Sequence, residues 1–129
     1  MSKELPVIIT GAGPTGLTLA LALGRAGIKV ELFEAADDLA DEIRASTIHA
    51  STLELWDGLG VADAIIAKGK KTYSLQFWER ASKTLVAEFD YGLIKNDTRY
   101  PFRLQCPQNI VTRELLPAVK ATGNVSVHM

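Results

Sequence analysis

The chain has 129 residues, of which 47% are hydrophobic and 22% charged, with a formal net charge of −1. This length provides for one core in a soluble globular domain, and the near-zero charge provides no basic surface for nucleic acid or an anionic membrane. The single cysteine, Cys106, excludes an internal disulfide and is typical of a reducing, cytoplasmic compartment.

A stretch without charged residues runs from Leu5 to Leu23 and is long enough to cross a bilayer. Three glycines and Pro14 interrupt it, and a proline breaks the interior of a helix. Lys3 is balanced by Glu4, so no basic region of a signal peptide precedes the stretch. We therefore predict a buried strand, a turn and a buried helix, and no membrane partner.

A strand, a helix and a second strand are predicted within the first 34 residues. Residues 7–9 are an apolar run, which predicts a strand buried on both faces. Residues 14–26 have small and apolar side chains at helical spacing, and Gly27 suits a C-cap. Residues 28–34 are again apolar enough for a buried strand. This order predicts an α/β fold that begins with a Rossmann-type βαβ unit.

Two short helices are predicted after an acidic loop over residues 35–44. Residues 51–54 have the sequence of a capping box, which predicts the start of a helix ending at Gly58 or Gly60. Residues 61–68 are predicted to form the next helix.

The pattern then changes to alternation, which is typical of half-buried strands. Alternating residues on both sides of a turn at residues 81–83 predict a β-hairpin from Lys70 to Tyr91. A helix follows over residues 109–121, which Pro117 must kink or shorten, and a last strand over residues 125–127.

Residues 11–16 match the motif G-x-G-x-x-G, directly after a predicted strand and at the start of a predicted helix. Gly11 permits the tight turn, Gly13 lets the backbone approach a pyrophosphate, and Gly16 permits close packing of helix on strand. Pro14 suits the first helical turn. With Thr15 it forms the helix N-terminus, whose free N–H groups bind phosphate.

Glu34 ends the second predicted strand, where a carboxylate accepts hydrogen bonds from an adenosine ribose. An acid at this place disfavours the 2′-phosphate of NADP. The alternative is that Glu34 is only a solvated strand end. Together with the glycine motif, Glu34 predicts dinucleotide binding but does not separate FAD from NAD.

A resemblance to a known protein family distinguishes FAD from NAD. The segments GAGPTGLTLALALGRAGIKVELFEA and IRASTIHASTLELWDGLGVADAIIAKG resemble the start of the aromatic-ring hydroxylases, FAD monooxygenases related to p-hydroxybenzoate hydroxylase and phenol hydroxylase. The resemblance continues through Pro107-Gln108 and residues 111–115, and so covers essentially the whole chain. It implies that Arg44 lies against the FAD pyrophosphate, with Ala45 and Ser46 beside the flavin. Paired guanidinium donors suit phosphate oxygens.

The resemblance also implies that Gln108 contacts the ribityl chain or a phosphate. The alternatives are a solvated loop arginine for Arg44 and a polar residue at a helix start for Gln108. His49 is interpreted as a polar loop residue, although it is near enough to Arg44 in sequence to approach the flavin. Structural roles are predicted for His128, Trp56, Trp78 and Cys106, and no residues have metal-ligand spacing.

For the parent protein, the resemblance implies hydroxylation of an aromatic, phenolic compound with NAD(P)H and O2, the cofactor being FAD. Residues 1–69 are predicted to be the FAD-binding unit, residues 70–100 the start of a substrate-domain sheet, and residues 101–129 a return to the FAD-binding domain. The family's Asp-Gly and Gly-Asp motifs have no counterpart here, so the chain is expected to be an amino-terminal part that is inactive alone.

Two alternatives stay open at this point. In the first alternative, the chain is the Rossmann domain of an NAD-dependent dehydrogenase, and in the second it is a non-catalytic piece that binds no cofactor tightly. Unpaired strand edges also predict self-association.

Overall fold

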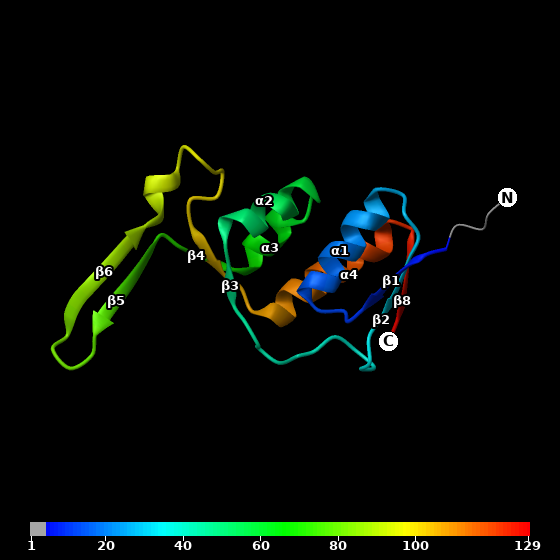
Figure 1. The fold of residues 1–129 in the computed structure, drawn as a ribbon, viewed down its shortest axis with the longest axis horizontal. Coiled ribbons are helices and arrows are strands. Elements are labelled where there is room, and N and C mark those ends of the chain that lie inside the picture. Colours follow the sequence, from blue (N-terminus) through cyan, green and yellow to red (C-terminus); the bar gives the residue numbers. More distant parts are fainter. Residues whose placement is uncertain (1–4) are drawn as a thin grey trace.

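The computed structural model describes residues 5–129, and a three-stranded parallel sheet carries helices on one face (Figure 1). The strand order is β1-β2-β8. These strands and the helices packed on them are β1 (Val7–Thr10), β2 (Val30–Phe33), β8 (Val125–His128), α1 (Pro14–Arg25) and α4 (Gln108–Ala121). The predicted α/β class and the Rossmann-type βαβ unit are confirmed, because β1, α1 and β2 follow one another and the two strands are parallel.

Helix α1 lies close to its neighbours because small residues interrupt its buried stripe. The stripe consists of Leu17, Ala20, Leu21 and Gly24. A Cβ atom on Gly24 would come within 2.6 Å of Thr122 Oγ1 and 2.8 Å of Val125 Cγ2. This glycine therefore allows α1 to approach the end of α4 and the start of β8. Helix α1 ends at Arg25 with Ala26 as its C-cap, one residue before the predicted Gly27, which follows with a φ of +80°.

The prediction that residues 7–9 form a strand buried on both faces is wrong. Ile9 is buried, whereas 58% of Ile8 is exposed. Side chains alternate across a strand, and Ile9 lies in one core with Leu17 of α1 and Leu115 of α4. Ile8 is therefore left on a face open to solvent.

A second, antiparallel sheet and two short helices lie beside this unit (Figure 1). Their elements are β3 (Thr47–Ile48), α2 (Ala50–Gly58), α3 (Ala62–Lys68), β4 (Lys70–Thr72) and β7 (Arg103–Gln105). The strand order is β3-β7-β4. Sequence patterns predicted neither β3 nor β7, because strands of two or three residues are too short to display alternation.

A two-stranded hairpin projects from the rest of the molecule (Figure 1). It consists of β5 (Ser74–Glu79) and β6 (Thr84–Asp90), and a 3₁₀ helix, η1 (Tyr91–Ile94), follows. The predicted turn is confirmed, with Lys83 in the left-handed region at a φ of +54°. The predicted start at Lys70 is wrong. Lys70–Thr72 pair instead with β7, where the buried Leu104 joins the core.

One prediction about a helix start is also wrong. Helix α2 begins at Ala50 with His49 as its N-cap and no side-chain capping bond, so Ser51 lies inside the first turn instead of capping it. Of the two effects predicted for Pro117, shortening does not occur, because α4 runs to Ala121 with Pro117 inside it. Pro117 is exposed, so the backbone carbonyl that loses its helical partner one turn earlier is accessible to water. The predicted ends of α2 at Gly58 and α3 at Lys68 are confirmed.

One hydrophobic core joins the parallel sheet and its helices to α2 and α3. Its largest fully buried members include Leu17, Leu21, Leu32, Leu53, Ile65, Leu104 and Leu115. Trp56 is buried as predicted, and its indole Nε1 donates to Thr18 Oγ1 at 2.9 Å, which fixes α2 on α1. No helix within residues 5–129 has the length and apolarity that a bilayer crossing needs.

Candidate cofactor site

The glycine turn connects the end of β1 to the start of α1. Gly11 has a φ of +95°, which L side chains rarely adopt, and its N–H donates to the Phe33 carbonyl at 2.7 Å. The turn is thereby fixed to the end of β2. Gly13 is the N-cap of α1, and Pro14 occupies the first helical turn as predicted.

Gly13 and Gly16 differ in the space that surrounds them. A Cβ on Gly16 would lie 2.0 Å from the Gly11 carbonyl oxygen, so no other residue fits beneath the turn. A Cβ on Gly13 would meet nothing within 4 Å. The backbone at Gly13 is therefore open to an approaching ligand. The adjacent first-turn N–H groups of α1, including that of Thr15, have no helical acceptor.

Glu34 lies directly across from the turn at the end of β2. Its Oε2 accepts from Ala12 N–H at 2.7 Å, and its Oε1 accepts from Ala35 and Ala36 N–H at 2.9 and 3.2 Å. These hydrogen bonds, that from Ala12 above all, hold the pKa of the Glu34 carboxyl below its ordinary value, and the charge of Arg44 lowers it further. Glu34 is therefore an ionised acceptor at neutral pH, held beside the glycine turn.

The segment that carries Ala45 and Ser46 is paired with the chain that leads into α4. The Ala45 carbonyl accepts from Gln108 N–H at 2.9 Å, and the Ser46 carbonyl accepts from Cys106 N–H at 2.8 Å. These backbone bonds extend the β3-β7 pairing beyond the strands. Ala45 and Gln108, which are far apart in sequence, are thus brought together.

A cavity of about 190 Å³ lies between the start of α1, the start of α2 and the start of α4. Its walls are formed by Pro14, Ala45, Ser46, Thr47, Ile48, His49, Thr52, Trp56, Cys106, Gln108 and Val111. Four of the predicted site residues therefore border one space beside the helix N-terminus, namely Pro14, Ala45, Ser46 and Gln108.

Arg44 and Thr15 are predicted site residues outside this cavity. The Arg44 side chain is 64% exposed and pairs with Glu42 at 3.1 Å. Thr15 is exposed and borders a second, apolar groove of about 490 Å³ along α1 and α2.

Three residues interpreted from the sequence as structural also line the cavity. His49 is exposed at the N-cap of α2, whereas Trp56 and Cys106 are buried in the wall. Burial raises the pKa of the Cys106 thiol, so the side chain is a neutral, apolar surface. The backbone bond between residues 46 and 106 places Cys106 there, and backbone bonds have no sequence signal over that distance.

The fold and this geometry define a dinucleotide-binding α/β domain. The chain also matches the model of the FAD binding domain family over residues 4–129. The chain therefore belongs to that family, and FAD is its cofactor. The resemblance to flavin-dependent monooxygenases predicted from the sequence is confirmed.

Curated relatives agree with this assignment. The chain is 37% identical to 6-methylpretetramide 4-monooxygenase of Streptomyces rimosus over 110 residues, 85% of this chain and 19% of that protein. It is 34% identical to 6-hydroxy-3-succinoylpyridine 3-monooxygenase HspB of Pseudomonas putida over 127 residues, 98% of this chain and 32% of that protein. The chain thus spans a third or less of the length of these relatives.

Two solved structures of monooxygenases have a similar fold. The p-nitrophenol 4-monooxygenase PnpA of Pseudomonas putida DLL-E4 superposes with a TM-score of 0.89 and 27% identity, covering 99% of this chain and 32% of that one. The flavin-dependent monooxygenase PieE, solved with FAD and substrate, superposes with a TM-score of 0.78 and 27% identity over 98% of this chain and 24% of that one.

Proposed function

We propose that this chain forms the pyrophosphate- and ribose-binding part of a flavin-dependent monooxygenase that hydroxylates a small aromatic, phenolic compound with NAD(P)H and O2. The observation that carries the proposal is the open backbone at Gly13, at the N-terminus of α1 and opposite the ionised Glu34. A helix N-terminus with a glycine that admits close approach is the arrangement that binds a dinucleotide pyrophosphate.

The residues present fit FAD. Gly11 and Gly16 shape the turn, Gly13 admits the pyrophosphate, and the free N–H groups near Pro14 and Thr15 face it. Glu34 would accept from the ribose hydroxyls. Arg44 would neutralise phosphate charge. Ala45, Ser46 and Gln108, which border the cavity beside the helix N-terminus, would contact the ribityl chain and flavin.

Bound FAD would supply the oxygen chemistry, which none of these side chains carries. The role of the chain is to bind and orient the cofactor. None of the proposed site residues is assigned proton transfer or nucleophilic attack. We expect the isolated chain to bind FAD without hydroxylating a substrate.

The test is retention of flavin by the purified chain. The protein is mixed with FAD and desalted, its visible spectrum is recorded, and NAD is titrated in parallel by calorimetry. We expect flavin absorbance to remain with the protein and to be lost in Gly13→Val, because a side chain there blocks the pyrophosphate. Arg44→Ala is expected to weaken FAD binding about tenfold, the ratio for one lost charge-assisted contact of ~1.4 kcal/mol.

Two other outcomes would contradict the proposal. NAD binding without FAD binding would favour an NAD-dependent dehydrogenase, an alternative that the comparisons do not favour. Binding of neither ligand would identify the chain as a scaffold that needs further sequence to hold a cofactor. A cytoplasmic location is part of the proposal, and it rests on the single free cysteine, Cys106.

A further inference from the structure

The segment between β2 and β3 carries Arg44 and has no helix or strand of its own. It runs from Ala35 to Ser46 as a loop and passes below α1 and α4 in Figure 1, where it is cyan. Leu39 is the buried residue in its first part, with an exposed fraction of 5%. A loop of this length keeps its side chains in one position only if contacts with other parts of the protein hold its backbone.

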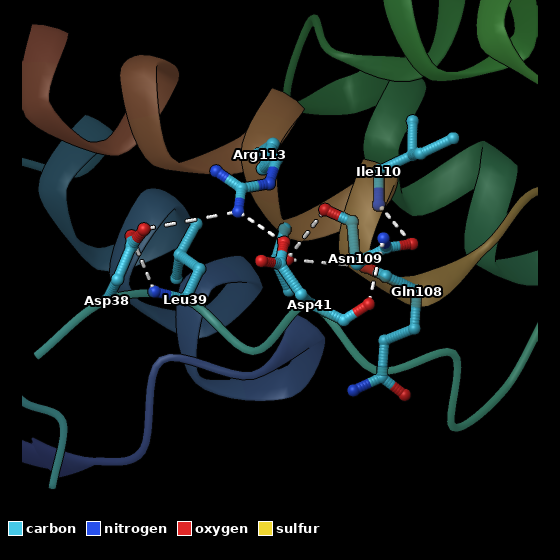
Figure 2. Close-up of polar contacts among 8 residues, drawn as sticks. Asp38, Leu39, Asp41, Gln108, Asn109, Ile110 and Arg113 are labelled. Carbon is cyan, nitrogen blue, oxygen red and sulfur yellow. Dashed lines mark hydrogen bonds and ion pairs between the residues drawn. The ribbon is translucent and has the colours of Figure 1, made fainter. Parts of the chain in front are cut away.

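The first turns of α4 provide such contacts (Figure 2). Arg113 Nη2 lies 2.5 Å from Asp41 Oδ1 and 4.0 Å from Asp38 Oδ2. Asn109 Nδ2 donates to the backbone carbonyl of Asp41 at 3.1 Å, while its Oδ1 accepts from Ile110 N–H at 3.0 Å. Asp41 is therefore held by its side chain and by its backbone.

Arg44 lies between two points at which α4 fixes the segment. Asp41 is held by Arg113 and Asn109, and Ala45 accepts from Gln108 N–H at 2.9 Å. The second anchor is a backbone hydrogen bond of Gln108 and does not involve the Arg113 side chain. In Figure 2 the Gln108 side chain also points away from Arg113. Two fixed points this close in sequence restrict where the Arg44 backbone lies.

We propose that Arg113 is a positioning residue for the cofactor site: through Asp41 it holds the segment of residues 35–46 against α4 and so restricts the position of Arg44 within that segment. The inference rests on the proposed FAD site and deepens it. Arg113 acts through Asp41 and does not itself bind the phosphates.

The expected effect is local. Arg113 and Asp41 are 45% and 82% exposed, and exposed ion pairs contribute little to global stability. Loss of the pair should loosen the segment while the core of the protein stays folded. Arg113→Gln is therefore expected to raise amide hydrogen exchange in residues 37–43 about fivefold in ligand-free protein, with an unchanged melting temperature.

A matched control is available in the same chain. Arg99 Nη1 lies 2.5 Å from Asp57 Oδ2, and the Arg99 side chain is 75% exposed. Arg99→Gln removes an equally short arginine–aspartate pair away from the segment and should leave exchange in residues 37–43 unchanged. Arg113→Lys keeps the charge and should restore most of the protection, because a single Nη atom makes the contact.

Asp41→Asn separates positioning from direct phosphate binding. If Arg113 positions the segment, Arg113→Gln and Asp41→Asn each raise the Kd for FAD about fivefold, and the double variant adds nothing further. If Arg113 binds phosphate itself, Asp41→Asn leaves FAD binding unchanged or tighter, since a competing carboxylate has been weakened. That second result would overturn the proposal.

The exchange measurement does not depend on the cofactor. If the unmodified chain binds no FAD, the proposed function fails, but exchange in Arg113→Gln still decides whether Arg113 holds the segment. Unchanged exchange in residues 37–43 would overturn the positioning role even if FAD binds normally.

Discussion

At the scale of single residues, the three glycines of one motif have three separate physical requirements. Gly11 has a left-handed φ, Gly16 has no room for a Cβ, and Gly13 has open space around it, where we propose that the pyrophosphate approaches. The fold therefore depends on glycine at positions 11 and 16, whereas a side chain at position 13 should not affect the stability of the fold. A substitution at each position should separate stability from binding.

Gly16→Ala is expected to destabilise the chain by about 3 kcal/mol, because its Cβ would overlap a backbone oxygen that cannot move without displacing the turn. Gly13→Ala is the matched control. Gly13 has a φ of −75° and open space around it, so the free energy of unfolding should change by less than about 1 kcal/mol. Urea denaturation measures both. Equal losses in the two variants would contradict the steric argument.

At the scale of elements, the hairpin is held by its turn more than by burial. Of its two strands only Leu75 and Ala87 are half-buried, and the other residues are exposed. The rings of Phe77 and Phe89 lie edge-on with their centroids 6.0 Å apart. Glu79 accepts from Ser82 and Ala81 N–H at 2.5 and 3.0 Å across the turn. A carboxylate with two backbone donors fixes the turn only while it is ionised.

This turn predicts a pH dependence. The hydrogen bonds from Ser82, then from Ala81, lower the pKa of Glu79 from an ordinary 4.5 to about 2. Since the folded pKa is lowered, the stabilisation is complete above pH 4.5 and is lost as the pH falls through about 2. A carboxyl NMR titration of the whole chain should give a midpoint near 2 for Glu79. A midpoint near 4.5 would show that the turn bonds do not form.

At the scale of the whole molecule, strand edges and one sheet face have no neighbour among residues 5–129. Within this range, β1 pairs only with β2, and β6 pairs only with β5. Ile8 and Val86 on these strands are 58% and 68% exposed. Unpaired edges with apolar side chains are templates for pairing with another chain.

We expect the isolated chain to self-associate through these edges, with a mass by light scattering that rises with concentration. Ile8→Lys combined with Val86→Lys should restore a monomer, because charged residues on an edge oppose pairing. Leu93→Lys is the control, since Leu93 is 82% exposed but lies in η1 and on no strand. A compact, stable monomer of the unmodified chain on size-exclusion chromatography would refute the prediction.

The sequence by itself determined the βαβ unit, the glycine turn and the acid at the end of β2. These features are local, because a turn, a helix start and a buried stripe depend on residues within a few positions of one another. The hairpin turn and the glycine that follows α1, Gly27, are predictable for the same reason. The resemblance, carried by whole segments, added the family and its cofactor.

Only the tertiary structure decided which distant residues lie together. The pairing of β4 with β7, the exposure of Ile8 and the position of Cys106 in the cavity wall depend on what packs on the other side of each segment. The contact between Arg113 and Asp41 joins residues 72 positions apart. Such contacts are made by side chains and backbone groups that leave no periodic pattern, so the fold alone brings them together.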